Sequence, residues 1–254
     1  MPRSRAAWQR WYRRWEEQQE SFNRNRERRF SAMLDVLEAT VGRRFTALDL
    51  GSGPGALSAR ILRRFPRARA VAVDYDPVVR AVGQGALGTV GGRLRWVDAD
   101  LGACDWDRSL LPGRFDAAVS TTALHWLARP RLDRLYRDLG RRLRAGGVFL
   151  NGDRLPWGQD APALARLAEG VRRLRRPGRR RRDGWDAWEA WWRDAEHDAE
   201  LGPLFGLRAE RHCQHPQHGD EPLSVHLRAL RRAGFRRAEV VWRDLEDGIL
   251  FAQR

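Results

Sequence analysis

A short apolar run that leads directly into a cluster of glycines limits the folds open to this chain more than any other feature. The run Phe45-Thr46-Ala47-Leu48-Asp49-Leu50 predicts a buried strand, and Gly51-Ser52-Gly53-Pro54-Gly55 follows it. Closely spaced glycines let the backbone turn sharply and approach a ligand that a β-carbon would exclude. Residues 56–64 predict the next helix, so the unit is strand, tight turn and helix.

Strands and helices continue to alternate after this unit. Apolar runs predict further strands at 70–73, 94–97, 115–119 and 148–150. Two final runs, at 239–242 and 249–252, flank Asp247-Gly248 and predict an antiparallel hairpin. Alternation of this kind implies a parallel sheet. We therefore expect an α/β fold with a Rossmann-like, seven-stranded, mostly parallel sheet, a C-terminal antiparallel hairpin and a helical lid insertion.

The chain divides into four parts on this interpretation. They are an N-terminal helical arm (1–40), a cofactor-binding core (41–151), an Arg-rich linker with a Trp-rich helical lid (152–222), and a C-terminal helix and hairpin that complete the core sheet (223–254). We expect no second independent domain.

Tryptophans recur at helical spacing in the arm and in the lid. Trp8, Trp11 and Trp15 share one face of the arm helix. In the lid the corresponding residues are Trp185, Trp188 and Trp192. We expect this second face to pack on the sheet, and the alternative is that it forms a wall of a hydrophobic substrate pocket.

The charge of the chain is strongly positive, with 48 basic and 33 acidic residues and a formal net charge of +15. Clustered basic groups gain affinity for polyanions by releasing counterions. However, every basic residue is arginine and isoleucine is nearly absent, a pattern expected from GC-rich codon usage. The run from Arg172 to Arg182 is accordingly interpreted as a solvated linker, and its alternative role is a grip on an RNA backbone.

Cysteines and membrane-like segments are scarce. Two cysteines are too few for a disulfide framework and favour a reducing compartment, so we expect a cytoplasmic protein without a membrane segment.

A local cluster of metal-type ligands does not match a metal site in its spacing, and we expect no bound metal there; its members are His212, Cys213, His215 and His218.

The glycine turn alone does not distinguish two classes of cofactor. Gly51, Gly53 and Ala56 also satisfy the dinucleotide pattern G-x-G-x-x-A. Asp74 ends the second strand, where its carboxylate can accept hydrogen bonds from ribose hydroxyls in either case. The remaining acidic residues favour a cationic sulfonium cofactor over a pyrophosphate. Asp49 either holds the turn or receives an ammonium group, and Asp100 either accepts an adenine amino group, with Leu101 as a backbone donor, or serves as a loop carboxylate.

Three segments in this order are similar to those of class I S-adenosylmethionine-dependent methyltransferases. They are residues 47–55, Val73-Asp74-Tyr75-Asp76-Pro77, and Arg144-Ala145-Gly146-Gly147-Val148. The segment 115–126 resembles the small-molecule, trans-aconitate methyltransferase-like branch. The resemblance implies that the glycine turn holds the methionine portion, Asp74 the ribose, Tyr75 a face of the adenine and Asp100 its amino group, with Ser120 near the methionyl end. It also implies that an arginine of the arm, among Arg24, Arg26, Arg28 and Arg29, pairs with the cofactor carboxylate.

His125 is the candidate catalytic residue. It follows the fourth strand, where it can act as a general base toward a hydroxyl or carboxylic acid. The alternative is that His125 packs in the loop, because alignment of the reactants alone accelerates methyl transfer. Methyltransferases of base amines resemble one another in an Asn-Pro-Pro-Tyr or Asp-Pro-Pro-Tyr motif here, and Ser120-Thr121-Thr122-Ala123 departs from it.

The primary hypothesis is therefore a methyltransferase that uses S-adenosylmethionine to methylate an oxygen, nitrogen or carbon atom of a small molecule. The alternatives are an RNA methyltransferase that uses the basic surface, an NAD-dependent oxidoreductase, and a cofactor-binding protein without catalysis. Neither the acceptor nor the oligomeric state follows from the sequence.

Overall fold

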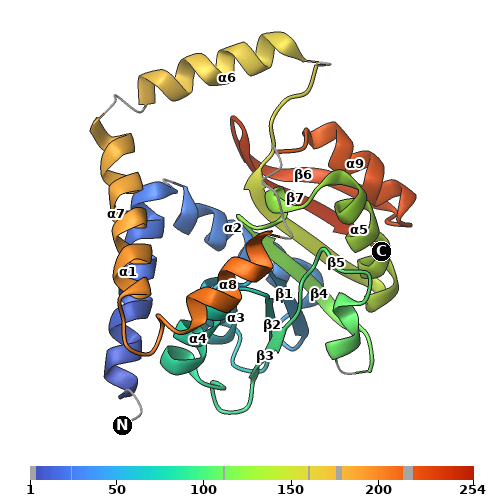
Figure 1. Ribbon diagram of the computed structural model, residues 1–254. Coiled ribbons are helices and arrows are strands. Elements are labelled where there is room, and N and C mark those ends of the chain that lie inside the picture. Colours follow the sequence, from blue (N-terminus) through green and yellow to red (C-terminus); the bar gives the residue numbers. More distant parts are fainter. Residues whose placement is uncertain (1–3, 24, 111, 160, 176–178, 214–219) are drawn as a thin grey trace.

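The sheet is the centre of the molecule (Figure 1). The structure, a computed structural model, describes residues 4–23, 25–110, 112–159, 161–175, 179–213 and 220–254. Within those residues, seven strands form one sheet in the order β3-β2-β1-β4-β5-β7-β6. Their bounds are Thr46–Leu50 (β1), Arg69–Asp74 (β2), Leu94–Asp98 (β3), Phe115–Thr121 (β4), Leu143–Arg154 (β5), Arg237–Asp244 (β6) and Asp247–Gln253 (β7). β7 pairs antiparallel with β5 and β6, and the other pairs are parallel, which confirms the expected fold class.

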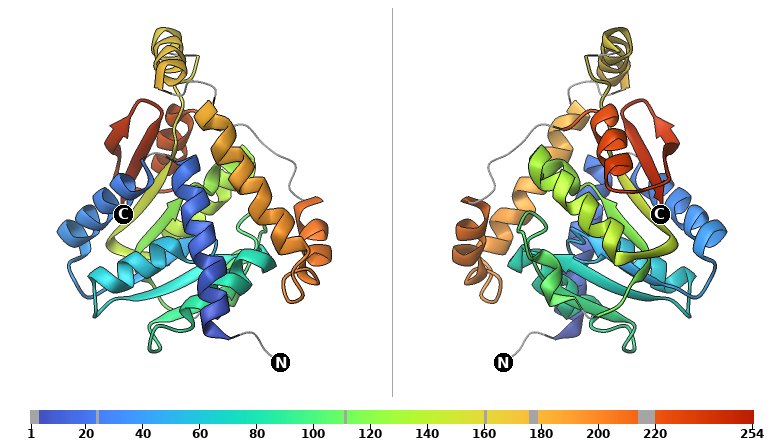
Figure 2. Two further views of the ribbon diagram at one scale, coloured as in Figure 1. Left: turned by 90° about the vertical axis from the view of Figure 1, so that its left-hand side faces the viewer. Right: turned by 90° about the vertical axis from the view of Figure 1, so that its right-hand side faces the viewer.

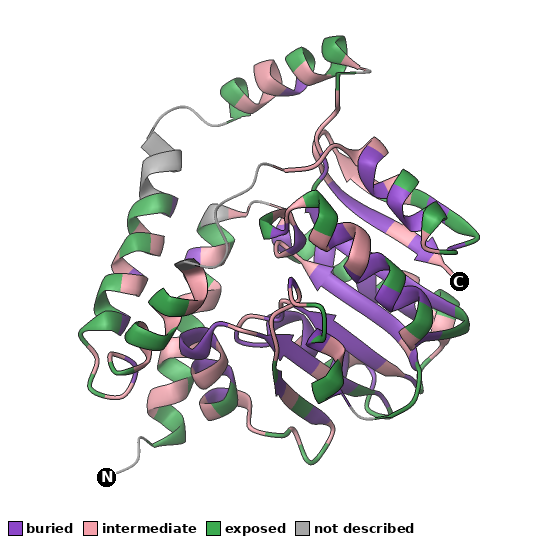
Figure 3. Ribbon diagram, turned by 45° about the vertical axis from the view of Figure 1, so that its right-hand side comes forward, coloured by how far each residue is buried: buried purple, intermediate pink, exposed green. Residues whose placement is uncertain are grey.

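Helices cover both faces of this sheet, whose strands are largely buried (Figure 3). One face packs against α5 and α9, and the other packs against α2 and α3. The helix bounds are Arg5–Phe22 (α1), Arg26–Val41 (α2), Ala56–Arg64 (α3), Pro77–Leu87 (α4), Arg129–Arg142 (α5), Pro162–Arg175 (α6), Arg179–Glu196 (α7), Leu204–Cys213 (α8) and Leu223–Arg232 (α9). The described residues also form two short 3-10 helices, Trp106–Ser109 (η1) and Leu124–Trp126 (η2). No helix of the described part of the chain is long and apolar enough to cross a membrane.

The start of α4 follows the local sequence. Asp76 accepts hydrogen bonds from the backbone N–H groups of Val78 (2.9 Å) and Val79 (3.4 Å), and Pro77 occupies the first turn. An aspartate cap satisfies amide groups that have no partner within the helix, and proline tolerates this position because it has no N–H to leave unpaired. The predicted cap is confirmed, and it fixes where the chain leaves the edge of the sheet.

Three element boundaries differ from the sequence expectation. α5 ends at Arg142 and β5 begins at Leu143, so Gly146 and Gly147 lie within the strand. In the hairpin, Asp244 pairs with Asp247, which leaves Leu245 (φ +58°) and Glu246 as the turn in place of Asp247-Gly248. The arginine run, expected as a linker, is helical at 172–175 in α6 and from 179 in α7; residues 176–178 lie outside the described part.

The lid helix α7 packs on the arm helix α1, not on the sheet as expected (Figure 2). The most deeply buried ring of this contact is Trp191, which is 1% exposed and meets Trp11 and Trp15 with ring centroids 5.5 and 4.9 Å apart. Trp185, by contrast, is 48% exposed. Because α1 has an apolar face of its own, the two tryptophan-rich helices bury their apolar faces against each other. We call this contact the α1–α7 seam.

Trp191→Ala will lower the free energy of unfolding by about 3–5 kcal/mol, because it removes the largest buried ring of the α1–α7 seam and leaves a cavity. Urea denaturation followed by circular dichroism measures the change. The matched control is Trp185→Ala on the same helix, which should change stability by about 0.5 kcal/mol or less because the ring is half exposed. Equal losses in the two variants would contradict the packing described here.

Candidate functional site

The glycine turn joins β1 to α3 at the carboxyl edge of the sheet. Gly51, Gly53 and Gly55 have φ of +65°, +53° and +83°, a region that glycine adopts readily. A Cβ on Gly51 would lie 2.4 Å from the Cβ of Ala123, so that position excludes any side chain. A Cβ on Gly53 would meet only Trp15 of α1, at 4.0 Å. The glycine turn therefore lies beneath α1, and the backbone of Gly53 faces Trp15 of that helix.

Ser52 holds this turn in place through its backbone. Its N–H donates to the carbonyl of Val73 on β2 (3.0 Å), and its carbonyl accepts from the N–H of Gly55 (2.9 Å). These bonds fix the turn against the second strand.

Asp49 is a buried carboxylate at the end of β1, with 1% of its surface exposed. Its Oδ2 accepts hydrogen bonds from Ser58 through both the hydroxyl (2.6 Å) and the backbone N–H (3.1 Å). Its Oδ1 is buried and has no partner among the described residues. Burial raises the pKa of Asp49 to about 6, with a further contribution from Asp74, although the bonds from Ser58 oppose the rise. Asp49 thus holds the turn and retains an acceptor atom for a donor.

Asp74 lies beside Asp49 at the end of β2. Its Oδ2 accepts from the N–H of Gly53 (2.7 Å) and its Oδ1 from the N–H of Asp76 (2.9 Å). Burial raises the pKa of Asp74 to about 6, and the negative charge of Asp76 adds to the rise. The structure therefore brings Asp49 and Asp74 together against the glycine turn, in a setting that disfavours negative charge.

Helix α8 closes over the residues that follow β2. The hydroxyl of Tyr75 lies 3.4 Å from Nε2 of His212, and Arg208 and His212 reach Asp76 at 2.9 and 3.3 Å. Burial raises the pKa of Tyr75 to about 12, and Asp74 and Asp76 add to the rise. Sequence reasoning did not place α8 here. His215 and His218 of the cluster considered for metal lie outside the described residues, and no metal-type cluster occurs in the described ones.

Asp100 and Leu101 follow β3 at the same edge. The Oδ1 of Asp100 accepts from the N–H of Gly102 (2.8 Å) within the same loop, and the charge of Asp100 is among those that raise the pKa of Tyr75. Leu101 is partly buried and packs against the core between the sheet and α5. Asp100 therefore lies near Tyr75, where the adenine end of a nucleoside is expected.

Ser120 is fully buried in β4, and its hydroxyl donates to the carbonyl of Leu50 on β1 (2.8 Å). This bond joins the two central strands next to the glycine turn. Its hydroxyl proton is thus used within the sheet, and contact with a cofactor stays a prediction.

His125 and Asp153 form a hydrogen-bonded pair at the ends of neighbouring strands. His125 lies in η2 after β4, and its Nδ1 is 2.9 Å from Oδ1 of Asp153, which ends β5 and is 2% exposed. Burial alone would lower the pKa of His125, but the Asp153 carboxylate outweighs it and raises the pKa above its ordinary value. The bond at Nδ1 leaves Nε2 as the ring atom that can take a proton, and the side chain is 21% exposed. Sequence reasoning missed Asp153.

The arm presents one arginine at this edge. Arg29 is buried and donates to Asp247 (2.7 Å) and to the hydroxyl of Thr122 (2.5 Å), and its Nε has no partner among the described residues. Arg26 instead pairs with Glu16, and Arg28 is exposed, while Arg24 lies outside the described residues. Of the four candidates, Arg29 is the buried arginine that borders the His125–Asp153 pair.

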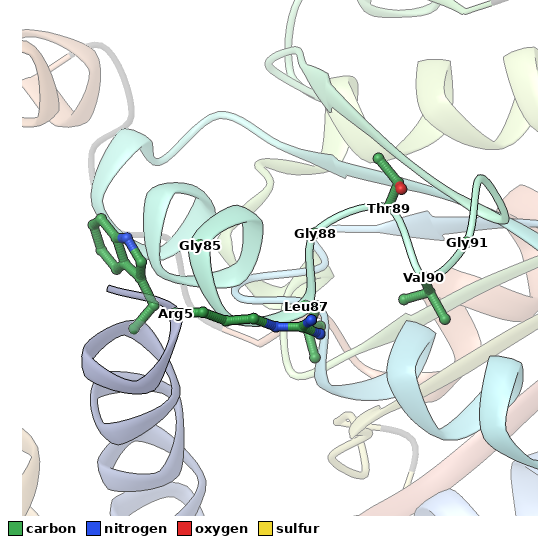
Figure 4. Close-up of a pocket in the computed structure, with 8 residues that line it drawn as sticks. Arg5, Gly85, Leu87, Gly88, Thr89, Val90 and Gly91 are labelled. Atoms are coloured by element: carbon green, nitrogen blue, oxygen red, sulfur yellow. The ribbon is translucent and has the colours of Figure 1, made fainter. Parts of the chain in front are cut away.

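The surface hollow shown in Figure 4 is a different place. It measures about 460 Å³ and is lined by Arg5, Gly85 and Thr89, among others. It lies at the C-terminal end of α4, whereas Asp76 caps the other end beside the glycine turn. A helix of 11 residues spans about 16 Å, so the length of α4 separates this hollow from the buried carboxylates.

Comparison with known proteins is consistent with this geometry. Residues 47–147 match a family described as a methyltransferase domain. The trans-aconitate 2-methyltransferase of Azoarcus sp. (strain BH72) is 33% identical over 119 residues, which cover 46% of this chain and 42% of that protein. The malonyl-[acyl-carrier protein] O-methyltransferase of Geobacter sulfurreducens is 35% identical over 103 residues, 40% of this chain and 36% of the relative. The chain thus spans less than half the length of these curated relatives.

Among solved structures, an O-methyltransferase family protein from Burkholderia thailandensis superposes with a TM-score of 0.56 at 19% identity, over 88% of this chain and 55% of that one. At this identity the likeness shows a shared fold. The family match assigns residues 47–147 to a methyltransferase domain, and the sheet order and the superposed structure show that this segment has the fold of the class I S-adenosylmethionine-dependent methyltransferases.

Proposed function

We propose that this protein transfers a methyl group from S-adenosylmethionine to a small-molecule acceptor. The observation that carries the proposal is the pair of buried carboxylates, Asp49 and Asp74, whose pKa values burial raises to about 6 beside a glycine turn. Buried carboxylates of this kind favour a cationic ligand, because a nearby positive charge restores their ionised form. S-adenosylmethionine carries positive charge on its sulfur and its ammonium group. The pyrophosphate of NAD would add negative charge at the same place, which disfavours the oxidoreductase alternative.

The residues present fit this cofactor. The partnerless Oδ1 of Asp49 is a suitable acceptor for the ammonium group, and the Asp74 carboxylate for ribose hydroxyls. Tyr75 and Asp100 would contact the adenine. The amide Nε2 of Gln18, one helical turn beyond Trp15 in α1, is buried without a partner among the described residues and would donate to the methionine carboxylate. Burying polar groups without partners is unfavourable, so these atoms support a ligand at this position.

The chemistry assigned to the chain itself is proton transfer at His125. When bound, S-adenosylmethionine supplies a methyl group whose bond to sulfur breaks with its electron pair as the acceptor atom bonds the carbon. Asp153 holds Nδ1 of His125, so neutral His125 has its Nε2 lone pair for a proton of the acceptor. The two-cysteine composition supports a cytoplasmic site of action.

Titration calorimetry with S-adenosylmethionine, S-adenosylhomocysteine and NADH, each on the same preparation, tests the proposal. We expect saturable one-to-one binding of the first two ligands and none of NADH. Binding of NADH without S-adenosylmethionine would overturn the proposed function. Binding of both methyl-cycle ligands with no turnover on a broad acceptor panel would overturn catalysis and leave a cofactor-binding protein.

A further inference from the structure

A second hollow lies where the chain leaves β5 toward α6, and its lining begins at Arg154, the residue after Asp153. Its volume is about 560 Å³, within the range of small-molecule sites. Two segments form its walls: the chain from β5 into α6, and the residues just before α9, which lie close together in Figure 1. The residues that bear on its chemistry are Arg154, Trp157, Gln159, Arg166, Asp220 and Pro222.

Two residues that line the hollow, Arg154 and Asp220, also interact with the proposed catalytic pair. Arg154 follows Asp153 directly, and its N–H donates to Oδ1 of Asp153 (2.9 Å), the same oxygen that His125 contacts. Asp220, on the opposite wall, is among the charges that act on the pKa of His125. A molecule seated in the hollow can therefore extend one end toward His125.

Trp157 supplies a flat wall with a fixed orientation. The guanidinium of Arg243 lies over its ring, 4.0 Å from the centroid, and donates to the carbonyls of Leu155 (2.8 Å) and Leu245. Because Arg243 covers one face of the indole, the part of the ring that Arg243 leaves uncovered lines the hollow. Stacking on a held aromatic ring favours a planar ligand.

The charge of the hollow is carried by Arg166. Arg154 is already paired with Asp220 (2.6 Å) and Glu246 (3.1 Å), so these groups largely offset one another. Arg166 lies exposed in the first half of α6, and no carboxylate among the described residues pairs with it. A guanidinium binds a carboxylate through two parallel hydrogen bonds, which makes an acid the matching ligand.

We propose that this hollow binds the methyl acceptor, and that the acceptor is a planar hydroxy acid. This inference rests on the proposed function. The carboxylate of the acceptor binds Arg166, its ring stacks on Trp157, and its hydroxyl extends toward His125. The hydroxyl proton passes to Nε2 of His125 and the oxygen takes the methyl group, which gives a methyl ether, S-adenosylhomocysteine and protonated His125.

The test measures binding separately from turnover. The protein is saturated with S-adenosylhomocysteine and titrated calorimetrically with 2-, 3- and 4-hydroxybenzoate and with the three corresponding hydroxybenzamides, which keep the ring and hydroxyl but lack the charge. We expect at least one acid to bind about tenfold or more tightly than its amide. Arg166→Ala should abolish that preference, and Trp157→Ala should weaken acid and amide alike.

Arg173→Ala is the matched control. It lies on the same helix with its side chain 72% exposed and does not line the hollow, so acid binding should be unchanged. Acids that bind no better than amides, an Arg166→Ala variant that keeps the preference, or no binding of any acid by protein loaded with S-adenosylhomocysteine would each overturn the inference. Failure to bind S-adenosylhomocysteine would overturn the proposed function and the inference with it. Methylation of neutral acceptors alone would overturn only the inference.

Discussion

Asp49→Asn will weaken S-adenosylmethionine binding by about 100-fold and will stabilise the protein without ligand. Oδ1 of Asp49 is buried and has no partner among the described residues. In the variant this position holds either a neutral amide oxygen or the amide N–H₂ group, so the ammonium group of the cofactor loses a charged acceptor in a buried site. A hydrogen bond between charged groups contributes about 1.5–3 kcal/mol, which corresponds to a loss of roughly 10- to 150-fold in affinity. Calorimetric titration of the variant measures the change.

The gain in stability follows from the direction of the pKa shift. The pKa of Asp49 is 3.8 in the unfolded chain and about 6 in the folded one, so the folded state binds the proton more tightly. Its contribution to stability is therefore largest below pH 4, is lost as the pH rises to about 6, and stays lost above it. Asparagine is neutral throughout, so at pH 7.5 the variant should be more stable by up to about 3 kcal/mol. Parent and variant should converge at low pH.

Asp138→Asn is the control for this pair of effects. Asp138 is also buried, but it accepts hydrogen bonds from Trp106 (3.0 Å) and Arg141. Its replacement should destabilise the protein and leave cofactor affinity unchanged. An Asp49→Asn variant that binds S-adenosylmethionine as tightly as the parent would show that Asp49 serves only to hold the turn.

His125→Ala will reduce kcat by about 100-fold or more, the usual contribution of a positioned general base. Affinity for S-adenosylhomocysteine should stay within about twofold of the parent, because His125 lies on the acceptor side of the proposed site. Asp153→Asn should give a smaller loss, since the histidine remains but its Nδ1 loses the carboxylate that holds it. Turnover of the hydroxybenzoate that is methylated fastest provides the assay.

The pH dependence of activity distinguishes a general-base role of His125 from a role in packing alone. The pKa of His125 reflects burial, which lowers it, and the carboxylates of Asp153 and Asp220, which raise it, while Arg29 opposes them; the net shift is upward. Activity should therefore rise with pH and level off above this raised pKa. Asp153→Asn removes the dominant negative charge, so its acid limb should move to lower pH. Nuclear magnetic resonance titration of the His125 ring gives the same shift without an acceptor.

His197→Ala is the matched histidine control, because His197 is exposed at the end of α7 and bonds only its own helix. It should change neither kcat nor the pH profile. A His125→Ala variant with parental kcat, or an Asp153→Asn variant whose acid limb does not move, would assign the pair to packing alone.

The features predicted correctly from sequence are those that neighbouring residues determine. The glycine turn, the Asp76 cap and the strand that ends at Asp74 depend on contacts within a few residues, so local pattern is sufficient to find them. The hairpin turn was displaced by two residues because the pairing register of Asp244 with Asp247 is set across strands, not by the Asp247-Gly248 pair.

The features that sequence reasoning missed depend on contacts between distant segments. Asp153 meets His125 because β4 and β5 are adjacent and parallel, although 28 residues separate the two side chains. An acidic residue at the end of the strand after a catalytic candidate was the available signal. Trp191 packs on Trp11 and not on the sheet, and their separation of 180 residues left no periodic pattern linking them. The position of α8 over Tyr75 had no local signal at all.

The α1–α7 seam connects the two proposed ligand sites. Trp15 of α1 both roofs the glycine turn and packs on Trp191 of α7, and α7 follows α6, which carries Arg166. A cofactor that binds against α1 and fixes its position thereby also limits the motion of α7. An acceptor that then binds to α6 pays less conformational entropy, because the neighbouring helix is already held in place. Linkage then requires each ligand to raise the affinity for the other by the same factor. The affinity for the acceptor should therefore be higher when S-adenosylhomocysteine is bound than in its absence, and calorimetry of the two states measures the factor.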